Sequence, residues 1–175
     1  MQQKMVTCMC WSGFVVRICS QDIFEFWCPY VCSSAAINGH LDVLQWLRSH
    51  DPPCPWNEMA CSVAAGQGHL HVLHWLRSQN PPCSWSEMAC RLAAELGQLE
   101  ALQWLRRQDP PCPWSGVVCR HAAMSGHLEV LRWLRRQDPP CPWNEIHCRY
   151  LLAQSSSWRN EESWREWLAS SMTLE

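Results

Sequence analysis

The sequence lacks a long apolar run and a strong excess of either charge. No stretch reaches the roughly 18 apolar residues that are needed to cross a bilayer, so we expect no association with a membrane. The formal net charge is only −2 over 175 residues, which gives no electrostatic reason to expect a nucleic-acid backbone as the partner. The weakly apolar residues 5–16 are interrupted by Thr7, Ser12 and Gly13, which argues against a cleaved signal peptide.

Catalytic sequence motifs are missing as well. The Gly-x-Ser-x-Gly, phosphate-loop and His-Glu-x-x-His patterns do not occur. His40, His69 and His127 each follow a glycine, but catalysis by histidine requires a nucleophile or a carboxylate held nearby. We therefore predict that the chain is not an enzyme, that it binds no cofactor and no small-molecule substrate, and that these histidines are structural.

Tryptophan, cysteine and proline are abundant instead, with 13, 13 and 12 copies. Most of them belong to one unit that recurs every 29 residues. A Cys-Pro-Trp or Cys-Ser-Trp cluster begins at Cys54, Cys83, Cys112 and Cys141. A second cysteine column, a pair of alanines, a glycine and a Trp-Leu pair keep the same period. The agreement of several independent columns indicates an internal repeat, which is typical of solenoid proteins.

Each unit has the start and stop signals of two short helices. In one unit, Asn57 is a good N-cap and Glu58 suits a first helical turn, so a first helix is predicted from about residue 58 to 67. Gly68 can end this helix in the left-handed conformation. A second helix is predicted from about residue 70 to 79, before two prolines that cannot continue it. The same N-cap position is held in other units by Ser86, Ser115 and Asn144.

Two helices of about ten residues cannot bury their own apolar faces, and isolated helices this short are marginal in water. The units must therefore stack, so that each pair covers the next. The alanine pairs allow close helix contact, and Trp-Leu pairs such as Trp75-Leu76 are expected to form a bulky layer between units. The sequence thus predicts an all-α solenoid of stacked helix–turn–helix repeats.

The repeated unit resembles the ankyrin repeat. An Ala-Ala pair, two variable residues and then Gly-His-Leu-Asp/Glu-Val-Leu occur within residues 33–44 and 121–131, and the resemblance covers about residues 28–153. The ankyrin unit has about 33 residues, whereas this unit has 29. The missing residues fall where ankyrin repeats carry a β-hairpin finger, and prolines such as Pro110 and Pro111 leave few backbone donors there. The resemblance implies ankyrin-like repeats with shortened or absent fingers.

The phase of the repeat divides the chain. The predicted segments are an unassigned N-terminal segment or ragged cap at 1–27, repeats at about 28–53, 54–82, 83–111 and 112–140, a partial repeat at 141–153, and a C-terminal capping helix or tail at 154–175. Cys28-Pro29-Tyr30 resembles the Cys-Pro-Trp cluster but lies only 26 residues before Cys54. The first helix of the first unit is therefore expected to be three residues shorter than the others.

The cysteine columns also admit a metal-binding or redox-responsive interpretation. Cys54 and Cys61 are separated by six residues, and His69 lies eight residues further on, whereas paired ligands of structural zinc sites usually have about two to four residues between them. The next unit has Gln98 in the place of His69. Cys61 falls at an inward position, where a free thiol acts as a small apolar group. We therefore favour core packing by reduced cysteines, predict no metal site, and expect a cytoplasmic location.

Positions that differ between units while their neighbours stay constant are the candidates for partner binding. In ankyrin repeats the place after the alanine pair faces the concave groove, so the resemblance implies binding there. The candidate residues are Ile37, Asn38, Gln67, Glu95, Leu96, Met124 and Ser125. The same variation arises if nothing constrains these positions, and one sequence does not separate the two interpretations.

Arg91, Arg120 and Arg149 form a column in successive first helices. One interpretation is a basic stripe that meets an acidic partner. The favoured interpretation is structural, because the ankyrin histidine at this place bonds backbone carbonyls of a neighbouring unit, and the guanidinium group has donors for the same role. The arginines at 106, 107, 135 and 136 are expected on a solvated outer face of the second helices.

Together these observations predict a scaffold or adaptor that binds an unknown protein partner through the concave face of an ankyrin-like solenoid, and that binds neither nucleic acid nor a membrane. Two alternatives stay open. One is a metal-binding or redox-responsive cysteine-rich repeat protein, and the other is a fragment of a larger ankyrin array with an effector domain elsewhere.

Overall fold

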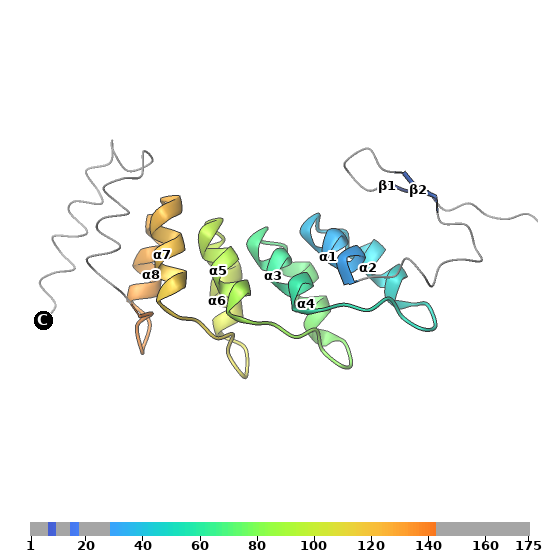
Figure 1. The fold of residues 1–175 in the computed structure, drawn as a ribbon. Helices are drawn as coiled ribbons and strands as arrows, with labels where there is room; N and C mark the ends of the chain where they lie inside the picture. Colours follow the sequence, from blue (N-terminus) through green and yellow to red (C-terminus); the bar gives the residue numbers. More distant parts are fainter. Residues whose placement is uncertain (1–6, 10–14, 18–28, 143–175) are drawn as a thin grey trace, which may run out of the picture.

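The computed structural model describes residues 7–9, 15–17 and 29–142. Eight helices lie in that part of the chain and form four consecutive pairs (Figure 1). The pairs are α1 (Pro29–Ile37) with α2 (Leu41–Arg48), α3 (Glu58–Gly66) with α4 (Leu70–Ser78), α5 (Glu87–Glu95) with α6 (Leu99–Arg106), and α7 (Gly116–Ser125) with α8 (Leu128–Arg135). The predicted all-α solenoid of helix pairs is confirmed.

Two short strands precede the helices. β1 (Thr7–Met9) and β2 (Val15–Arg17) pair in antiparallel fashion, with Cys8 opposite Val16. They fall within the segment 1–27, to which the sequence assigned no structure. The predicted capping segment 154–175 and the partial repeat beyond residue 142, which includes Asn144 and Arg149, lie outside the described residues.

Side-chain caps determine where the first helices begin. The side chain of Asn57 accepts a hydrogen bond from the backbone N–H of Met59 at 3.0 Å. Ser86 and Ser115 cap α5 and α7 in the same way. These caps satisfy backbone donors that have no partner inside the helix, and they confirm the three predicted N-caps in the described residues.

The first helix of the first pair is not shortened, so that prediction is wrong. α1 has nine residues, as α3 and α5 do. Pro29 occupies its first position, where a helix has no use for the backbone N–H that proline lacks. Pro29 and Tyr30 therefore belong to a helix, and their likeness to the Cys-Pro-Trp linker cluster was misleading.

A glycine in the left-handed conformation separates the two helices of every pair. Gly68 has a φ of +74°. The N–H of His69 donates to Ala64 O at 2.9 Å, and the N–H of Gly68 donates to Ala65 O at 3.1 Å, which is the Schellman pattern. The equivalent glycines 39, 97 and 126 have φ values of +72°, +73° and +83°. The predicted glycine stop is confirmed in all four pairs.

The first helices pack side by side in one row, with the second helices beside them (Figure 1). The most extensive contacts of the solenoid join α1 to α3, α3 to α5 and α5 to α7. These helices approach closely because their alanine pairs, such as Ala64-Ala65 and Ala93-Ala94, are fully buried. Leu73 and Leu76 of α4 are buried as well, and each contributes on the order of 1.5–3 kcal/mol. Stacking thus stabilises helices that are too short to be stable alone.

The tryptophans lie at the edge of this core, which differs from the expected Trp-Leu layer. Leu76 is fully buried, whereas Trp75 is only half-buried. Adjacent helical residues point about 100° apart, so only one side chain of the pair can face the first-helix row. Trp75 instead packs edge-to-face against Trp56 of the linker, with ring centroids 5.8 Å apart. The same contact recurs in Trp85–Trp104 and Trp114–Trp133.

The linkers that follow α2, α4, α6 and α8 contain no strand within residues 29–142. Each passes through a cis peptide bond at its first proline, as at Asp109-Pro110. The chain then returns, and the N–H of Cys112 donates to Leu105 O at 3.0 Å. The expected loss of the ankyrin finger is therefore found. No helix among the described residues has both the length and the apolar character of a membrane span.

Candidate protein-binding face

One side of the first-helix row carries apolar side chains that the second helices do not cover. The inward side of each first helix is filled by residues such as Cys61 and Ala64, which are fully buried. Residues spaced one turn apart on the opposite side of the helix therefore reach solvent. At α5 this side carries Met88 and Leu92, which are half-buried, and Leu96, which is 45% exposed.

We call this surface the first-helix face and define it by the apolar side chains Ile37, Met59, Met88, Leu92, Leu96 and Met124. The 29-residue register places them at a few equivalent positions, and consecutive first helices are in contact, so the face extends over four repeats. Ile37 is 41% and Met124 is 49% exposed. Exposed apolar side chains that gather on one face favour an interaction site.

The residues predicted to bind a partner lie where the first helices end. Three of them are exposed apolar side chains, namely Ile37, Leu96 and Met124. The polar ones comprise the exposed Asn38 and Gln67 and the half-buried Glu95 and Ser125. They occupy one end of the first-helix face, at equivalent positions of four successive repeats.

Sequence reasoning missed the other end of the face. Met59 and Met88 lie in the first turn of α3 and α5 and are half-buried. A signal was present, because this column holds an apolar residue in every described unit, with Tyr30 and Val117 at the outer repeats. Helical spacing places the column away from the buried cysteines. Attention to variable positions alone overlooked it, because the column varies little in character.

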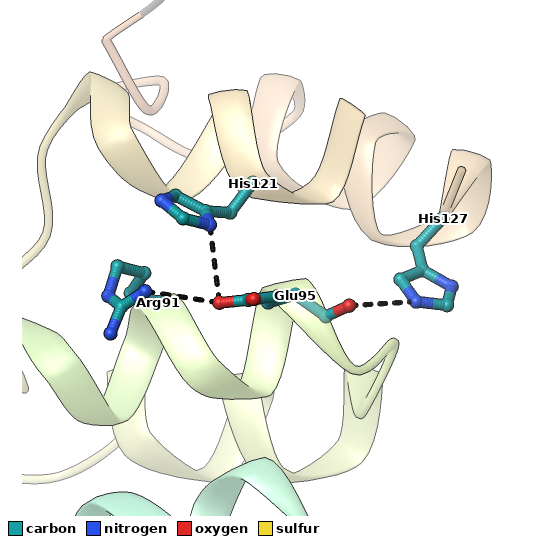
Figure 2. Close-up of polar contacts among 4 residues, drawn as sticks. All are labelled: Arg91, Glu95, His121 and His127. Atoms are coloured by element: carbon teal, nitrogen blue, oxygen red, sulfur yellow. Dashed lines mark hydrogen bonds and ion pairs between the residues drawn. The ribbon is translucent and has the colours of Figure 1, made fainter. Parts of the chain in front are cut away.

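Glu95 joins two neighbouring first helices on this face (Figure 2). Its Oε2 accepts a hydrogen bond from Arg91 Nη1 of α5 at 3.1 Å and contacts His121 Nδ1 of α7 at 3.2 Å. Its backbone carbonyl accepts a hydrogen bond from His127 Nε2 at 3.0 Å. One predicted binding residue is therefore also a bridge between the third and fourth repeats.

The contact between His121 and Glu95 is made by a neutral imidazole near neutral pH. Burial lowers the pKa of His121 from its ordinary value of 6.5. The carboxylate of Glu95 acts in the opposite direction, but the positive charges of Arg91 and Arg120 add to the lowering. The net direction is downward, so His121 Nδ1–H donates a hydrogen bond to the carboxylate without carrying a charge.

The two described arginines of the predicted column make contacts other than those expected. Arg91 pairs with Glu95 on its own helix, and Nε of Arg120 is buried with no hydrogen-bond partner among the described residues. Bonds to a neighbouring repeat's carbonyls are made by histidines instead, as His69 Nε2 donates to Ile37 O at 3.2 Å. These bonds support the structural role predicted for the histidines. Glu95 lies one helical turn after Arg91 and pairs with it, so the surface along this column is not uniformly basic.

The arginines that end the second helices hold the linkers in place. Arg77 Nη1 donates to Cys83 O at 2.7 Å, and its Cζ lies 3.9 Å from the ring centroid of Trp85. Arg106 makes the same two contacts with Cys112 and Trp114. The expectation that Arg106 is solvated on the outer face is therefore wrong, because the returning linker brings a carbonyl and an aromatic ring to its guanidinium group.

The other arginines near the ends of the second helices include side chains that bind the linker and side chains that are exposed to solvent. Arg48 repeats the contacts of Arg77 with Cys54 and Trp56, and Arg135 donates to Cys141 O at 3.1 Å. Arg107 and Arg136, one residue further along the chain, are exposed, as expected. Arg135 is exposed as well, as expected, although it also donates to the linker.

Eight cysteines of the described residues are free and fully buried. The predicted inward position of Cys61 is therefore correct. Within the described ranges, no group of three or more histidine, cysteine, aspartate or glutamate side chains is arranged to hold a metal ion.

Residues 32–77 match the family model of ankyrin repeats (many copies). This match supports the assignment of these residues to the ankyrin repeats. The matched residues extend from α1 to α4, and the same helix–glycine–helix pair continues through α8. No curated protein matches the chain significantly. Ankyrin repeats are generally protein-interaction modules and their family is a non-enzymatic fold.

A second family model, the leucine rich repeat N-terminal domain, matches residues 66–91, 96–120 and 124–149. Each of these segments contains one second helix and the linker that follows it. Leucine-rich repeats carry a strand in every unit, whereas residues 29–142 contain none. The observed architecture therefore agrees with the ankyrin repeats and not with this second match.

Proposed function

We propose that this ankyrin-repeat protein is a scaffold or adaptor that binds a partner protein through the first-helix face. The observation that supports this most is the exposure of Ile37, Leu96 and Met124 at equivalent ends of the first helices. Exposing large apolar side chains to water is unfavourable, so three of them on one face favour an interaction surface over a solvated one.

The outward side of the second helices offers no comparable surface. The second residue of each second helix is polar and exposed. These residues are Asp42, His71, Glu100 and Glu129. These helices turn their leucines inward and keep polar groups in water. The contrast between the two rows favours a partner that presents apolar side chains to the first-helix face.

The distribution of constant and variable columns supports the same assignment. The alanines, the glycine turn and the inward leucines recur in every described repeat because stacking depends on them. The column of Ile37, Gly66, Glu95 and Met124 has a different residue in each repeat. We infer that the exposed members of this column, Ile37 and Met124, set partner choice, since they lie outside the buried core.

Capture from the source cells followed by measurement with the purified partner tests the proposal. The combined variant Ile37→Ala, Leu96→Ala and Met124→Ala should weaken the partner's Kd by at least about tenfold, because truncation of anchoring side chains at an interface commonly costs more than about 1 kcal/mol each. Both proteins should first be checked for equal urea midpoints.

A matched control places the same number of changes on the second helices. The variant Asp42→Ala, Glu100→Ala and Glu129→Ala should leave the Kd within about twofold, because surface substitutions away from an interface have small effects. An unchanged Kd for the first-helix variant, or an equal loss in both variants, would remove the proposed face.

The free thiols support a reducing compartment. We therefore propose a cytoplasmic location and a binding role without catalysis, as the ankyrin fold suggests. Fractionation of the source cells, followed by alkylation of free thiols before lysis, checks the compartment. Recovery of the protein in an oxidising compartment would contradict this part of the proposal.

A further inference from the structure

Two buried thiols meet at each junction between repeats. Cys61 on α3 and Cys83 in the linker that leads to α5 are 22 residues apart, and Cys61 Sγ donates to Cys83 O at 3.8 Å. Cys90 and Cys112 repeat this contact at 3.9 Å. Within each of these pairs the two thiols are also close enough to shift each other's pKa. The same thiol–thiol contact occurs between Cys32 and Cys54 and between Cys119 and Cys141.

We call these four contacts the thiol pairs. Each pair joins a first helix to the linker that begins the next repeat, so the pairs run along the solenoid at the 29-residue period. All eight sulfurs belong to side chains that are fully buried. The linker thiol has a second contact, because Cys83 Sγ donates to Asn57 O at 3.3 Å and Cys112 Sγ to Ser86 O at 3.3 Å.

The two thiols of a pair are chemically different. The hydrogen bond from Cys61 lowers the pKa of Cys83, and the nearby guanidinium of Arg77 adds to the lowering, against the opposing effect of burial. The pairing with Cys83 and burial both raise the pKa of Cys61. Cys90 and Cys112 have the same asymmetry, with Arg106 beside Cys112. One thiol of each pair is thus a better thiolate, and the other is its hydrogen-bond donor.

Packing alone does not require this arrangement. A single small apolar residue would fill either position, and alanine fills the neighbouring buried positions of the same helices. Packing also gives no reason for a cysteine in the helix column to face a cysteine in the linker column at all four junctions. The pairing brings together two groups that can form one covalent bond.

We propose that the thiol pairs are reversible dithiol–disulfide sites at which a low-molecular-weight disulfide links one ankyrin repeat to the next. The Cys83 thiolate attacks one sulfur of the small disulfide, forming a mixed disulfide and releasing one small thiolate. Cys61 then loses its proton and displaces the second small thiolate, and the Cys61–Cys83 bond forms. Two protein thiols are oxidised, the small disulfide is reduced, and the two protons end on the two released thiols.

Burial determines when this reaction occurs. A small disulfide cannot reach a fully buried sulfur, so a junction must open locally before the linker thiolate reacts. Once the bond has formed, the helix and the following linker can no longer separate. Oxidation is therefore slow in the stacked solenoid, faster where a junction opens, and stabilising once complete.

Disulfide mapping of the full chain tests the proposal. The reduced protein is incubated with oxidised glutathione in urea concentrations below its unfolding midpoint, and the remaining thiols are then alkylated. Arg77 lies between Cys61 and Cys83, so tryptic peptides of these two cysteines stay joined only through a disulfide. Each peptide also holds a second cysteine, Cys54 or Cys90, so fragmentation of the joined peptides assigns the bond. We expect the pairs Cys61–Cys83 and Cys90–Cys112, their loss on treatment with dithiothreitol, and a higher urea midpoint for the oxidised protein.

A variant within the same chain provides the control. Cys83→Ser should leave Cys61 reduced and should abolish that one disulfide, while Cys90–Cys112 still forms and shows that the solenoid has folded. Thiols that stay reduced throughout the incubation would overturn the proposal, and so would disulfides that join cysteines without regard to the pairs. If partner binding is measured with dithiothreitol present, the outcome of the disulfide mapping is independent of the proposed scaffold function.

Discussion

Replacement of Arg77 by alanine tests whether the linker contacts stabilise the solenoid as the structure indicates. The guanidinium of Arg77 makes a 2.7 Å hydrogen bond to Cys83 O and stacks on Trp85 with its Cζ 3.9 Å from the ring centroid. Trp85 in turn packs against Trp104 of α6. Arg77 therefore connects the end of α4 to the following linker and, through Trp85, to α6 of the next repeat.

The magnitude follows from these two contacts. A hydrogen bond from a charged group contributes about 1.5–3 kcal/mol, and a cation–π contact that is partly exposed about 0.5–1 kcal/mol. Arg77 is half-buried, so solvent screening places both values at the lower end of their ranges. Cys83 O keeps the weak thiol contact from Cys61 and is not left without a partner. We expect Arg77→Ala to lower the free energy of unfolding by about 2 kcal/mol.

Urea unfolding followed by circular dichroism measures this change. With a slope of about 2 kcal/mol/M, a loss of about 2 kcal/mol moves the midpoint down by about 1 M. Arg107→Ala is the matched control, because Arg107 is exposed at the equivalent end of α6, and it should change the stability by no more than about 0.5 kcal/mol. Arg77→Lys should behave like Arg77→Ala, since an ammonium group lacks the planar fork. If Arg77→Ala costs no more than Arg107→Ala, the linker contacts are not the source of junction stability.

Two further substitutions have defined outcomes. Gly97→Ala should lower the free energy of unfolding by at least about 1–2 kcal/mol, because a Cβ at φ +73° is strained and would lie 2.6 Å from His127 Nδ1; Gly116→Ala, whose φ is not positive, should cost less in the same urea assay. Acidification should destabilise the protein through His121, since its folded pKa lies below 6.5: as pH falls through about 6.5 the unfolded chain takes up a proton that the folded chain does not. His121→Gln should therefore lose less stability between about pH 7.5 and pH 5.5, and an equal loss in both proteins would show that His121 makes no contribution.

The elements of this fold could be predicted from the sequence because their signals are local. Asn57 and Gly68 act within a few residues of chain, so an N-cap and a left-handed glycine define helix ends wherever the repeat brings them. The 29-residue period then requires every unit to adopt the same pair of helices. Where the period was weakest, at Pro29, a local likeness to the linker cluster led to a wrong helix start.

The contacts between a second helix and the linker that follows it could not be predicted. They join residues whose spacing is not that of neighbours on a helix, so no local pattern indicates them. Arg77 reaches Cys83 and Trp85 only because the linker returns along α4. From the sequence, an arginine at a helix end can equally be interpreted as an exposed charge in water. Arg107 is such a residue. Met59 and Met88 were overlooked for a different reason, because the search for binding residues considered only variable positions and this column keeps its apolar character in every described repeat.

Stacking and the proposed partner binding use different sides of the same short helices, and Glu95 belongs to both. Ile37, Leu96 and Met124 project from the first-helix face, and none of them bridges repeats through a side-chain hydrogen bond. Glu95 lies on the same face but also connects α5 to α7 through His121. A change at Glu95 would therefore alter junction stability as well as any partner contact. Leu96 also lies close to Gly66 of the preceding repeat, whereas the exposed apolar side chains of Ile37 and Met124 cannot form a bridge like that of Glu95. For this reason the apolar positions can diverge in a repeat protein without loss of fold, and they are the ones whose substitution isolates recognition from stability.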